Sequence, residues 1–513
     1  MLIDWILALS PILVILVLMI FFRWGAAKAG PAGWFTAVLV AVLRFGAGIE
    51  LLALSQMKAV LLTMDVLLIV WAAFLLYQVA DEAGAVSALS RALPLLTPDR
   101  GMQALLIAWA FASFLQGVGG FGVPTAVTAP LMLGLGFSPV VAVVAPSIGH
   151  SWSVTFGSLA SSFQALMAAT GLPGDLLAPL SALLLGLVGF VCGFMVVHVC
   201  VGGGGIRRLA LPVLIMGLSM SGVQYFLATR GFWHLAGFGA GLAGLAVGFL
   251  IARWGRRKSE NSEAERMDEG QLLLMLSGYM ALILITILIQ LVEPVRTFLG
   301  QVVIEVPFPE IETSLGYVTP AGYGRRIYLL RHGGAILLYA STVAYVVYRW
   351  AGLYKDGSFR RILGNTVRRV MSSSLGIAVM VSMAVVMAHA GMTDVLAKGL
   401  AVGVGTYFPV ISPWIGALGA FMTGSNTNSN VVFSVLQMRT AELLAISVSL
   451  ILASQTTGGA VGSVIAPTKI IVGASTAGMA GREGEILKKL LLYLIPLLIA
   501  LSLLVWGLVE VIG

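Results

Sequence analysis

Residues 114–124 read Phe-Leu-Gln-Gly-Val-Gly-Gly-Phe-Gly-Val-Pro and interrupt a long apolar stretch with four glycines and a proline. Each glycine in a helix interior costs about 1 kcal/mol relative to alanine, so we expect the helix over 105–117 to end here. Pro124 lacks an amide hydrogen and suits the first turn of a new half-helix over 125–134. The stretch therefore predicts a helix that breaks and starts again.

The composition places this break inside a membrane. The 513 residues are 59% hydrophobic and only 10% charged, with a mean hydropathy of +1.00, whereas soluble proteins carry about 25% charged residues. The chain is therefore predicted to be an all-α, polytopic integral membrane protein. Unwound backbone at membrane depth must be buried in protein or line a cavity, because lipid offers it no hydrogen bonds.

Apolar runs of membrane-spanning length follow one another along the chain. Examples cover 32–53, 125–148, 176–201, 209–228 and 429–459. Several runs are too long or too interrupted for one helix, so we expect roughly 12–14 transmembrane helices, broken half-helices included. The longest polar excursion, 293–333, is predicted to be an extramembrane loop with short helices or strands. It would separate an N-terminal half, 1–292, from a C-terminal half, 334–513.

The basic side chains indicate how the helices are oriented. A net charge of +8 would suggest nucleic acid in a soluble domain, but here the lysines and arginines gather in short loops between apolar runs. Three such loops, near 207–208, 253–266 and 349–369, are each two spans apart, and the positive-inside rule places them in the cytoplasm. This predicts a multi-pass protein of the plasma membrane (the inner membrane in bacteria) with no nucleic-acid partner.

A second interruption, Phe-Met-Thr-Gly-Ser-Asn-Thr-Asn-Ser-Asn, occupies residues 421–430. Six consecutive small polar side chains within apolar flanks need hydrogen-bond partners in a bilayer. An exposed loop is the alternative, since Asn and Ser also dominate turns, but the apolar flanks leave little room for one. We therefore expect a second unwound segment that binds a polar ligand.

Each break is followed further along the chain by another polar segment that is expected to interrupt a helix, which we call a weak point. Residues 146–153 form the one after the first break, and 454–459 form the one after the second. The two broken-helix regions, 114–153 and 421–469, thus share a layout. This layout suggests two structural halves related as inverted repeats, an arrangement in which transporters place the substrate site where broken helices meet.

The chemistry of the breaks suits a small anion. The half-helix after Pro124 would present free N–H groups and a partial positive charge to a carboxylate, although glycines also let helices pack closely. His150 could bind an anion when protonated, relay a proton, or simply bond a neighbour. Lys469 could neutralise a carboxylate or extend to the membrane surface. His198 and His389 are more typical of packing or boundary positions, and no acid lies within either break.

At these residues the chain resembles the lactate permease family. Thr97-Pro-Asp-Arg-Gly101 and the run FLQGVGGFGVPTAVTAPLMLGLGF resemble the family's Thr-Pro-Asp stretch and its FLEGAAGFGxPVAI-like core. The run ISPWIGALGAFMTGSNTNSNVVFSVLQ is similar to its GxLGxFLTGSDTSSNxLFxxLQ signature, and ASQTTGGAVGSVIAPTKI is similar to its ANTTGGxxGKxISPQSI stretch. The matches are long, in the same order and similarly spaced over most of the chain.

The resemblance implies secondary active uptake of small 2-hydroxymonocarboxylates, L-lactate above all and glycolate as well, coupled to protons. The chain departs from the family pattern in an informative way. Gln116 and Asn426 stand where Glu and Asp are common, His150 where Asn is expected, and Thr468-Lys469 replaces Gln-Ser. An amide cannot carry a titrating proton, which opens the way to another coupling ion or a shifted substrate. The same changes make the cavity less negative for an anion.

The residue pattern and the resemblance together define the candidate substrate-binding residues. They are Gln116, Gly117, Gly119, Gly120, Gly122, Thr125, His150, Ser151, Ser425, Asn426, Thr427, Asn428, Ser429, Asn430, Thr456, Thr457, Gly458, Gly459 and Lys469. The predicted partners are a small carboxylate, a coupling ion (a proton, with sodium as the alternative) and the lipid bilayer. We predict no cofactor, metal or catalytic residue, and the sequence leaves the oligomeric state open.

Other functions stay open on the sequence alone. A sodium-coupled or facilitative carrier of another organic anion, such as a dicarboxylate, fits the same breaks. A membrane-embedded enzyme would have to rely on His150 and nearby serines, since the sequence has no metal-ligand cluster or Ser/His/Asp motif. A receptor or scaffold would need a sizeable soluble domain, and none is evident.

Overall fold

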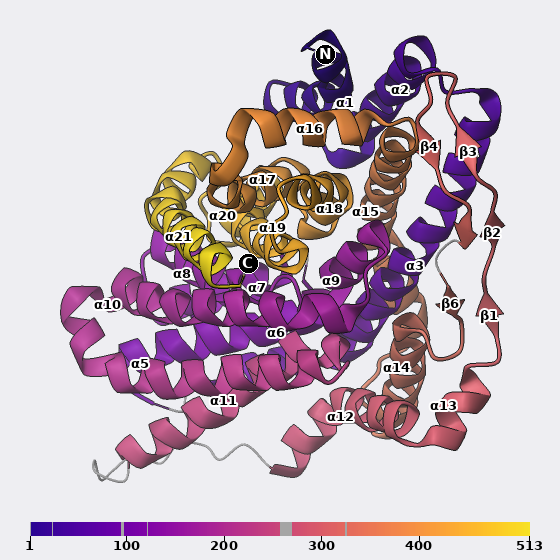
Figure 1. Cartoon of the computed structure of the whole chain (residues 1–513). Helices are drawn as coiled ribbons and strands as arrows, with labels where there is room; N and C mark the ends of the chain where they lie inside the picture. Colours follow the sequence, from indigo (N-terminus) through magenta and orange to yellow (C-terminus); the bar gives the residue numbers. More distant parts are fainter. Residues whose placement is uncertain are drawn as a thin grey trace.

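The computed structural model describes residues 2–22, 24–93, 97–120, 122–256, 269–323 and 326–512. Phe121 of the first break, and most of the charged residues of the basic loop predicted near 253–266, lie outside these ranges. The described residues are helical almost throughout (Figure 1), which confirms the all-α architecture. Among them, ten helices are long and apolar enough to cross a membrane, or eleven if a bent pair over 274–299 counts as one span.

Seven elements of the described chain precede the first break. They are α1 (Leu2–Ile20), α2 (Ala26–Phe45), α3 (Ile49–Glu82), α4 (Ala85–Ala92), α5 (Arg100–Ala104), the π-helix η2 (Leu105–Phe111) and α6 (Ala112–Val118). The run 32–53 is not one span, and that prediction is wrong. Gly46 ends α2 with a φ of +70° and Gly48 precedes α3. Glycine adopts this left-handed angle without a steric penalty, so the chain turns inside an apolar run.

The described rest of the N-terminal half contains three short helices followed by three long ones. They are α7 (Val123–Gly134), α8 (Pro139–Ser151), α9 (Gly157–Thr170), α10 (Gly174–Thr229), α11 (Trp233–Arg256) and α12 (Glu269–Leu291). The run 125–148 is therefore two helices, because Gly136 turns the chain with a φ of +79° and Pro139 starts α8. The runs 176–201 and 209–228 share α10, which is kinked at Gly202.

The polar excursion consists of α13 (Glu293–Leu299) and a long β-hairpin. Its strands are β1 (Val303–Ile304), β2 (Pro307–Phe308), β3 (Ile311–Glu312), β4 (Val318–Thr319), β5 (Gly322–Tyr323) and β6 (Ile327–Tyr328), paired antiparallel as β1–β6, β2–β5 and β3–β4. The tip is anchored where Ser314 N–H donates to the carbonyl oxygen of Gly46 at 3.0 Å. The hairpin runs along one edge of the molecule (Figure 1). Its position outside the membrane stays a prediction.

The C-terminal half ends in a compact group of helices. Its elements are α14 (Gly333–Trp350), α15 (Ser358–His389), α16 (Met392–Val404), the 3-10 turn η3 (Gly405–Tyr407), α17 (Phe408–Thr423), α18 (Asn426–Leu443), α19 (Val448–Ser463), α20 (Pro467–Thr476) and α21 (Glu483–Ile512). The run 429–459 spans parts of two helices. Ile446 N–H bonds back to the carbonyl oxygen of Ala441 at 3.1 Å, and Ala445 has a φ of +53°, which closes α18 with a left-handed cap.

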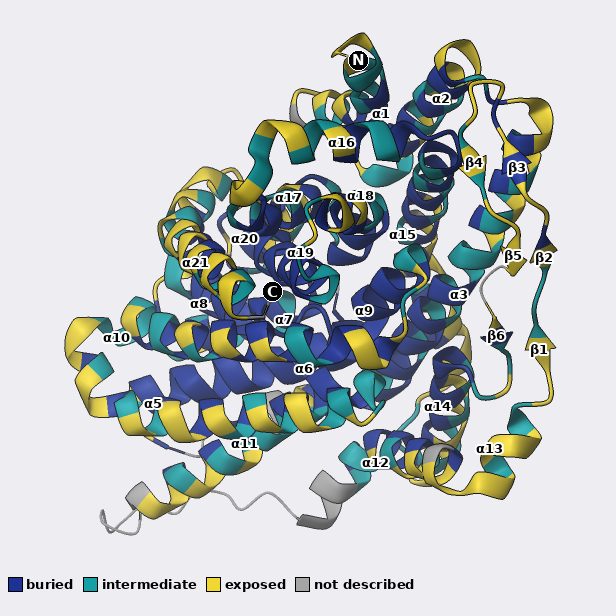
Figure 2. Ribbon diagram, viewed as in Figure 1, coloured by how far each residue is buried: buried dark blue, intermediate teal, exposed yellow. Residues whose placement is uncertain are grey.

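The buried centre of the molecule is made of elements from both predicted halves. Figure 2 shows α6, α9 and α17–α19 mostly dark, whereas α10, α11 and α21 expose one face. α9 packs on α18, α10 on α19, and α3 on α15. The two halves therefore interlock around a common centre, and both breaks lie in it. The inverted-repeat relation between them stays a prediction.

Candidate substrate-binding site

The first break falls where the sequence predicts it. Gly120 and Gly122 have φ angles of +57° and +86°, and α7 begins two residues before the predicted start, with Pro124 in its first turn. Such angles are easy only for glycine. None of the described side chains caps the N-terminus of α7, which is buried, with Thr125 only 4% exposed. Val123 N–H donates to the carbonyl oxygen of Gly120 at 2.9 Å and Pro124 has no N–H, so it is the partial positive charge of this helix end that can receive an anion.

Gln116 lies in the last turn of α6 and is buried. Two glycines leave the space for its amide: a Cβ on Gly120 would lie 3.2 Å from Nε2, and a Cβ on Gly157 would lie 2.6 Å from it. The added Cβ on Gly120 would also collide with Ser158 Oγ. Oε1 of Gln116 finds no hydrogen-bond partner among the described residues. This oxygen can therefore accept a hydrogen bond from a ligand.

The second break is shorter than predicted. Only Gly424 and Ser425 lie between α17 and α18. Ser425 caps α18 by accepting the N–H of Asn428 at 3.4 Å, and such a cap stabilises the helix that follows. The prediction of unwound backbone over 421–430 is thus wrong for 421–423, which end α17, and for 426–430, which begin α18. The side chains of 426–430 project from the first turns of α18.

The first turns of α18 are bonded to α19 and to the segment that leads into α9. Asn426 Nδ2 donates to Thr155 Oγ1 at 3.1 Å and to the carbonyl oxygen of Thr456 at 3.2 Å. Asn430 Nδ2 donates to Thr456 Oγ1 and to the carbonyl oxygen of Ser162, both at 2.9 Å. All five residues are buried. The two broken regions therefore meet in one polar network, which we call the central network.

α9 contributes residues to the central network that were not predicted from the sequence. Ser162 Oγ lies 3.0 Å from Thr427 Oγ1. Nearby, Ser158, Leu159 and Ala160 form a left-handed turn with φ angles from +46° to +66°. Such angles cost roughly 1–2 kcal/mol per residue for L-amino acids, so packing must hold the turn in place. The serines in an apolar run were the one available signal for this segment.

Several buried polar atoms around the breaks have no hydrogen-bond partner within the described ranges. They are the amide oxygens of Gln116, Asn426, Asn428 and Asn430, the hydroxyls of Ser454 and Thr457, and Nε2 of His150. Leaving a buried polar atom unpaired costs about 1–3 kcal/mol, and native proteins keep few of them. A polar ligand would supply the missing partners.

His150 and Lys469 both turn inward. His150 Nδ1 lies 2.6 Å from the carbonyl oxygen of Pro146, so Nδ1 carries the hydrogen and Nε2 is an acceptor in the neutral ring. Lys469, in the first turn of α20, donates from Nζ to the buried Ser463 Oγ at 3.1 Å. The two side chains are close enough to interact electrostatically. Lys469 can present positive charge to an anion, and His150 can do so once it gains a proton.

The two further weak points are mostly helical, contrary to the prediction. α19 continues through 454–459, whereas α8 continues through 146–151 and only 152–153 belong to the link that runs to 156; the link after α19 is 464–466. Gly458 serves helix packing and does not interrupt α19, because a Cβ there would collide with the carbonyl oxygen of Pro413. Gly117 acts in the same way, since its Cβ would meet the backbone of α11. At these two glycines the close-packing alternative holds.

Some predicted residues face away from the central network. Ser151 Oγ donates to a carbonyl oxygen of the preceding turn at 2.8 Å, and Ser429 Oγ donates to a carbonyl oxygen of α17 at 2.8 Å. Thr125 Oγ1 lies 3.3 Å from a serine hydroxyl of α8. A Cβ on Gly119 would contact the ring of Tyr77. Of these residues, Thr125 stays beside the open N-terminus of α7.

A second polar layer, also missed in the sequence, joins α17, α18 and α19. Gln455 Nε2 donates to Ser429 Oγ at 3.0 Å, and Gln437 Nε2 donates to Gln455 Oε1. Ser412 Oγ donates to Gln437 Oε1 at 2.5 Å. Single polar residues in separate apolar runs gave no pattern, because only packing brings them together. The layer holds α18 and α19 in register behind the central network.

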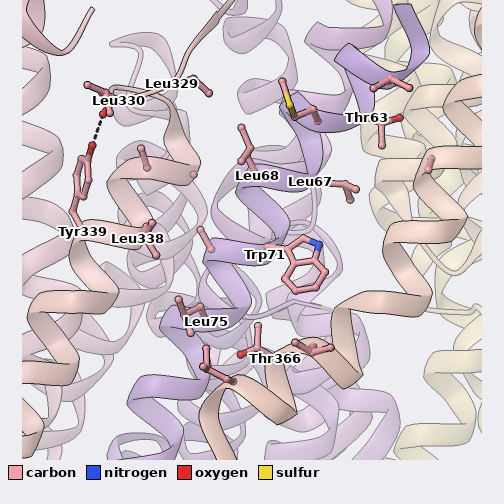
Figure 3. Close-up of a pocket in the computed structure, with 18 of the residues that line it drawn as sticks. Thr63, Leu67, Leu68, Trp71, Leu75, Leu329, Leu330, Leu338, Tyr339 and Thr366 are labelled. Carbon is pink, nitrogen blue, oxygen red and sulfur yellow. Dashed lines mark hydrogen bonds between the residues drawn. The ribbon is translucent and has the colours of Figure 1, made fainter. Parts of the chain in front are cut away.

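A cavity of about 810 Å³ lies between α3, α14 and α15 (Figure 3). Leucines and Trp71 dominate its wall, and Tyr339 points its hydroxyl at the carbonyl oxygen of Leu330, 3.0 Å away. None of the predicted site residues lines it. An apolar cavity does not compensate a carboxylate for its lost hydration, so the size of this cavity does not make it the substrate site.

A second cavity, of about 530 Å³, lies between α3, α9, α15, α18 and the β-hairpin, and we call it the basic cavity. Its charged and titratable lining residues are Lys58, Arg326, His389, Asp394 and Arg439. Val431 of α18, which follows Asn430 of the central network, also lines it. Arg326 pairs with Glu305, and Arg439 pairs with Glu442 and Asp394, so these ion pairs compensate much of the positive charge in the lining. The cavity offers an approach to the central network.

Comparison with known proteins agrees with this architecture. The chain matches the family described as L-lactate permease over residues 4–512. It is similar to the putative L-lactate permease of Haemophilus influenzae, with 24% identity over 99% of this chain and 98% of that protein. It is similar to the glycolate permease GlcA of Escherichia coli (24%, 94% and 91%) and to the L-lactate permease of Bacillus subtilis (27%, 94% and 95%).

Among solved structures, the YdaH transporter of Alcanivorax borkumensis gives a TM-score of 0.46 at 15% identity, over 86% of this chain and 84% of that one. The family match covers nearly the whole sequence, apolar helices included. The protein is therefore a multi-pass membrane permease and not an enzyme. By its sequence from residue 4 to residue 512, the chain belongs to the L-lactate permease family.

Proposed function

We propose that this protein is a secondary active transporter that takes up L-lactate and related small 2-hydroxymonocarboxylates, such as glycolate, by symport with protons. Relatives that align along most of the chain are named L-lactate permease and glycolate permease, which supports the substrate class. These relatives are bacterial, and the bacterial inner membrane is the setting that fits such a carrier.

One observation carries the proposal: a buried helix N-terminus shares the centre of the molecule with unpartnered amide oxygens. A 2-hydroxy acid has a carboxylate that accepts hydrogen bonds and a neighbouring hydroxyl that can donate one. The carboxylate would bind at the partially positive start of α7. The hydroxyl would donate to Gln116 Oε1 or Asn426 Oδ1, neither of which has a partner among the described residues.

The charge of these side chains favours an anion as well. Gln116 and Asn426 are neutral, whereas an acid at either position would repel a carboxylate. Lys469, whose Nζ donates to Ser463 Oγ, adds a positive charge near His150. An amide does not titrate, so the coupling proton of this symporter must bind somewhere else.

Uptake of radiolabelled L-lactate and glycolate into proteoliposomes tests the proposal. We expect an inward proton gradient to drive accumulation above the equilibrium level, and a protonophore to reduce it to equilibration. Unlabelled glycolate should compete, and acetate, which lacks the hydroxyl, should compete poorly. The substrate assignment fails if no small 2-hydroxy acid is taken up or exchanged.

A sodium-coupled carrier of another organic anion is the second candidate. Four amide oxygens without partners in the described part of the chain favour it, since hard cations take oxygen ligands. Replacing the proton gradient by a sodium gradient separates the two. Uptake that follows sodium and ignores the protonophore would select this candidate over the first.

A further inference from the structure

A buried acid–histidine pair lies outside the two breaks. Asp65, in the middle of α3, is 1% exposed, and its Oδ1 lies 2.9 Å from Nε2 of His332, the residue that caps α14. Gln164 Nε2, on α9, donates to Oδ2 of the same carboxylate at 2.9 Å. Ionisable side chains at membrane depth are costly, and they commonly mark ion or proton pathways. Neither member of the pair belongs to the site described above.

The hydrogen bonds indicate where the protons of the pair sit. Gly334 N–H donates to Nδ1 of His332 at 3.2 Å, so Nδ1 is an acceptor and the hydrogen of the neutral ring is on Nε2. Nε2–H then donates to Asp65, which also accepts from Gln164. In this state the ring is neutral, the carboxylate is ionised, and the pair carries one negative charge.

An added proton must change one of these hydrogen bonds. On Nδ1 it would displace the N–H of Gly334, and on Oδ1 of Asp65 it would face the hydrogen on Nε2. On Oδ2 it would turn an acceptor into a donor, so Gln164 would have to rotate its amide and present Oε1. Each position makes the pair neutral. Protonation therefore changes a hydrogen bond of the pair, and when the proton binds Oδ2 that bond is the one with Gln164 of α9.

α9 carries this change to the central network. Gln164 is two residues after Ser162. Ser162 accepts from Asn430 at its carbonyl oxygen and meets Thr427 with its hydroxyl. If α9 shifts when the Gln164 amide rotates, both contacts of Ser162, with Asn430 and with Thr427, would move.

A second connection runs through α11. His234 Nδ1 lies 3.0 Å from the carbonyl oxygen of Leu159, in the left-handed turn. The ring of His234 also packs on Gly333, next to His332, so closely that a Cβ on Gly333 would come within 2.5 Å of it. Ser158 of the same turn lies against Gly120 of the first break. The pair is thus in contact with both broken regions through their supporting residues.

Among the described residues, the titratable and charged groups placed near the pair come from α11, α3, α15 and the β-hairpin. His234 of α11 is beside it, and α9 has no titratable residue. On α3, Lys58 lies about 10 Å away along the helix axis, and its Nζ is 3.4 Å from Nε2 of His389 on α15. Arg326 of the β-hairpin shares the basic cavity with Lys58. Val66 and Ala165, the sequence neighbours of Asp65 and Gln164, line that cavity too, so the pair lies close behind an apolar part of its wall.

We propose that Asp65 and His332 form the proton-binding site of this transporter and that Gln164 couples it to the substrate network. The inference rests on the proposed function, because it names the group that holds the coupling proton. One proton taken up from the outer side makes the pair neutral, and one substrate anion binds in the central network. The proton leaves to the inner side with the substrate. The symport of one proton and one anion then moves no net charge.

Asp65→Asn tests the proposal, since it removes the titrating group and preserves the size of the side chain. Two rates are measured in proteoliposomes: exchange of labelled lactate at equal pH on both sides, and accumulation driven by an inward proton gradient, with a pH dye inside. We expect the variant to keep exchange within about threefold and to lose accumulation and proton uptake by about tenfold or more. His332→Gln should show the same split.

Matched controls come from an acid and a histidine that face outward. Asp4 pairs with Arg44 at 2.6 Å, and His198 lies 2.7 Å from the hydroxyl of Tyr493, both at exposed positions. Asp4→Asn and His198→Gln should keep exchange, accumulation and proton uptake.

The outcomes separate this inference from the proposed function. Wild-type levels of accumulation and proton uptake in Asp65→Asn would overturn it. If the variant loses exchange as well, infrared pH titration of the purified protein in lipid decides, because a titrating carboxyl band present in the wild type must be absent from Asp65→Asn. An identical band in both would also overturn the inference. If the wild type transports no 2-hydroxy acid, the proposed function fails, and the infrared titration still tests Asp65.

Discussion

The two breaks bury irregular backbone by different means. The link from α6 to α7 relies on glycine conformation at Gly120 and Gly122, and no described side chain caps the start of α7. The link from α17 to α18 is capped by Ser425, and Asn426 and Asn430 reach across to α19 and to α9 with the segment before it. One break thus offers a partially positive helix end, and the other offers side-chain amides. A 2-hydroxy acid needs both kinds of group.

Glycine plays different parts in the two regions. Gly120 and Gly122 have left-handed backbone angles that other residues rarely adopt. Gly458 and Gly459 are ordinary helical residues of α19, and their missing side chains make room for α17 and for Asn426 Oδ1. Substitutions at these positions therefore distinguish the effect of backbone strain from the effect of a side chain that fills space needed by a neighbour.

The largest effect is expected for Gly120→Ala. The left-handed angle and the collision with Ser158 Oγ together should cost about 3 kcal/mol, which corresponds to about 100-fold slower uptake if it falls on the site. Lactate uptake and thermal unfolding in detergent measure the two consequences.

Two neighbouring glycines are the controls for Gly120→Ala. Gly122→Ala adds strain without a collision, since the nearest atom to its Cβ would be 3.9 Å away, so it should cost less. Gly134→Ala, in α7 with open space around it, should be neutral or slightly stabilising. Equal losses in all three variants would mean that the break does not depend on backbone conformation.

A large, pH-dependent effect is expected for Asn426→Asp. The ionised acid cannot donate to the carbonyl oxygen of Thr456 and would repel the substrate, which should raise the KM for lactate about 30-fold at neutral pH, or about 2 kcal/mol. As the pH falls, the protonated acid can donate again, so uptake by the variant should recover towards that of the wild type. A KM series across pH measures this, and a variant whose KM does not improve in acid would contradict the donor role of Asn426.

A moderate effect is expected for Gly459→Ala. Its Cβ would press on Asn426 Oδ1, so we expect about tenfold weaker lactate affinity with little loss of stability. Gly458→Ala should do the reverse, because its Cβ would meet the backbone of α17. Measuring the KM and the unfolding temperature of each variant distinguishes lost affinity from lost stability. If both variants changed the same quantity, the different roles given to Gly458 and Gly459 would be wrong.

The smallest effect is expected for Ser151→Ala. Ser151 bonds within α8 and faces Cys192, so its loss should cost less than about 0.5 kcal/mol and change uptake by less than about twofold. Uptake kinetics measure it. A strong loss of transport would instead mean that Ser151 belongs to the substrate-binding site, as predicted from the sequence.

Much of the fold could be predicted from the sequence because its signals are local. The membrane class follows from the apolar content, and the first break follows from glycines and a proline that act on their own backbone. The turn at Gly46 and the left-handed turn at Ser158 could not be predicted. The first lies within an apolar run, and the second is held by packing that no neighbouring residue in the sequence reveals.

The site divides in the same way. The sequence by itself determined that two polar, glycine-containing segments lie in a membrane and that most site candidates belong to them. Only the tertiary structure decided which polar atoms are satisfied there, because the decisive hydrogen bonds join residues far apart: Thr155 to Thr456, and Asp65 to His332. Inside an apolar protein a polar atom must find a partner wherever the packing provides one. Which partner a polar atom finds depends on the folded chain as a whole and is not visible as a periodic pattern in the sequence.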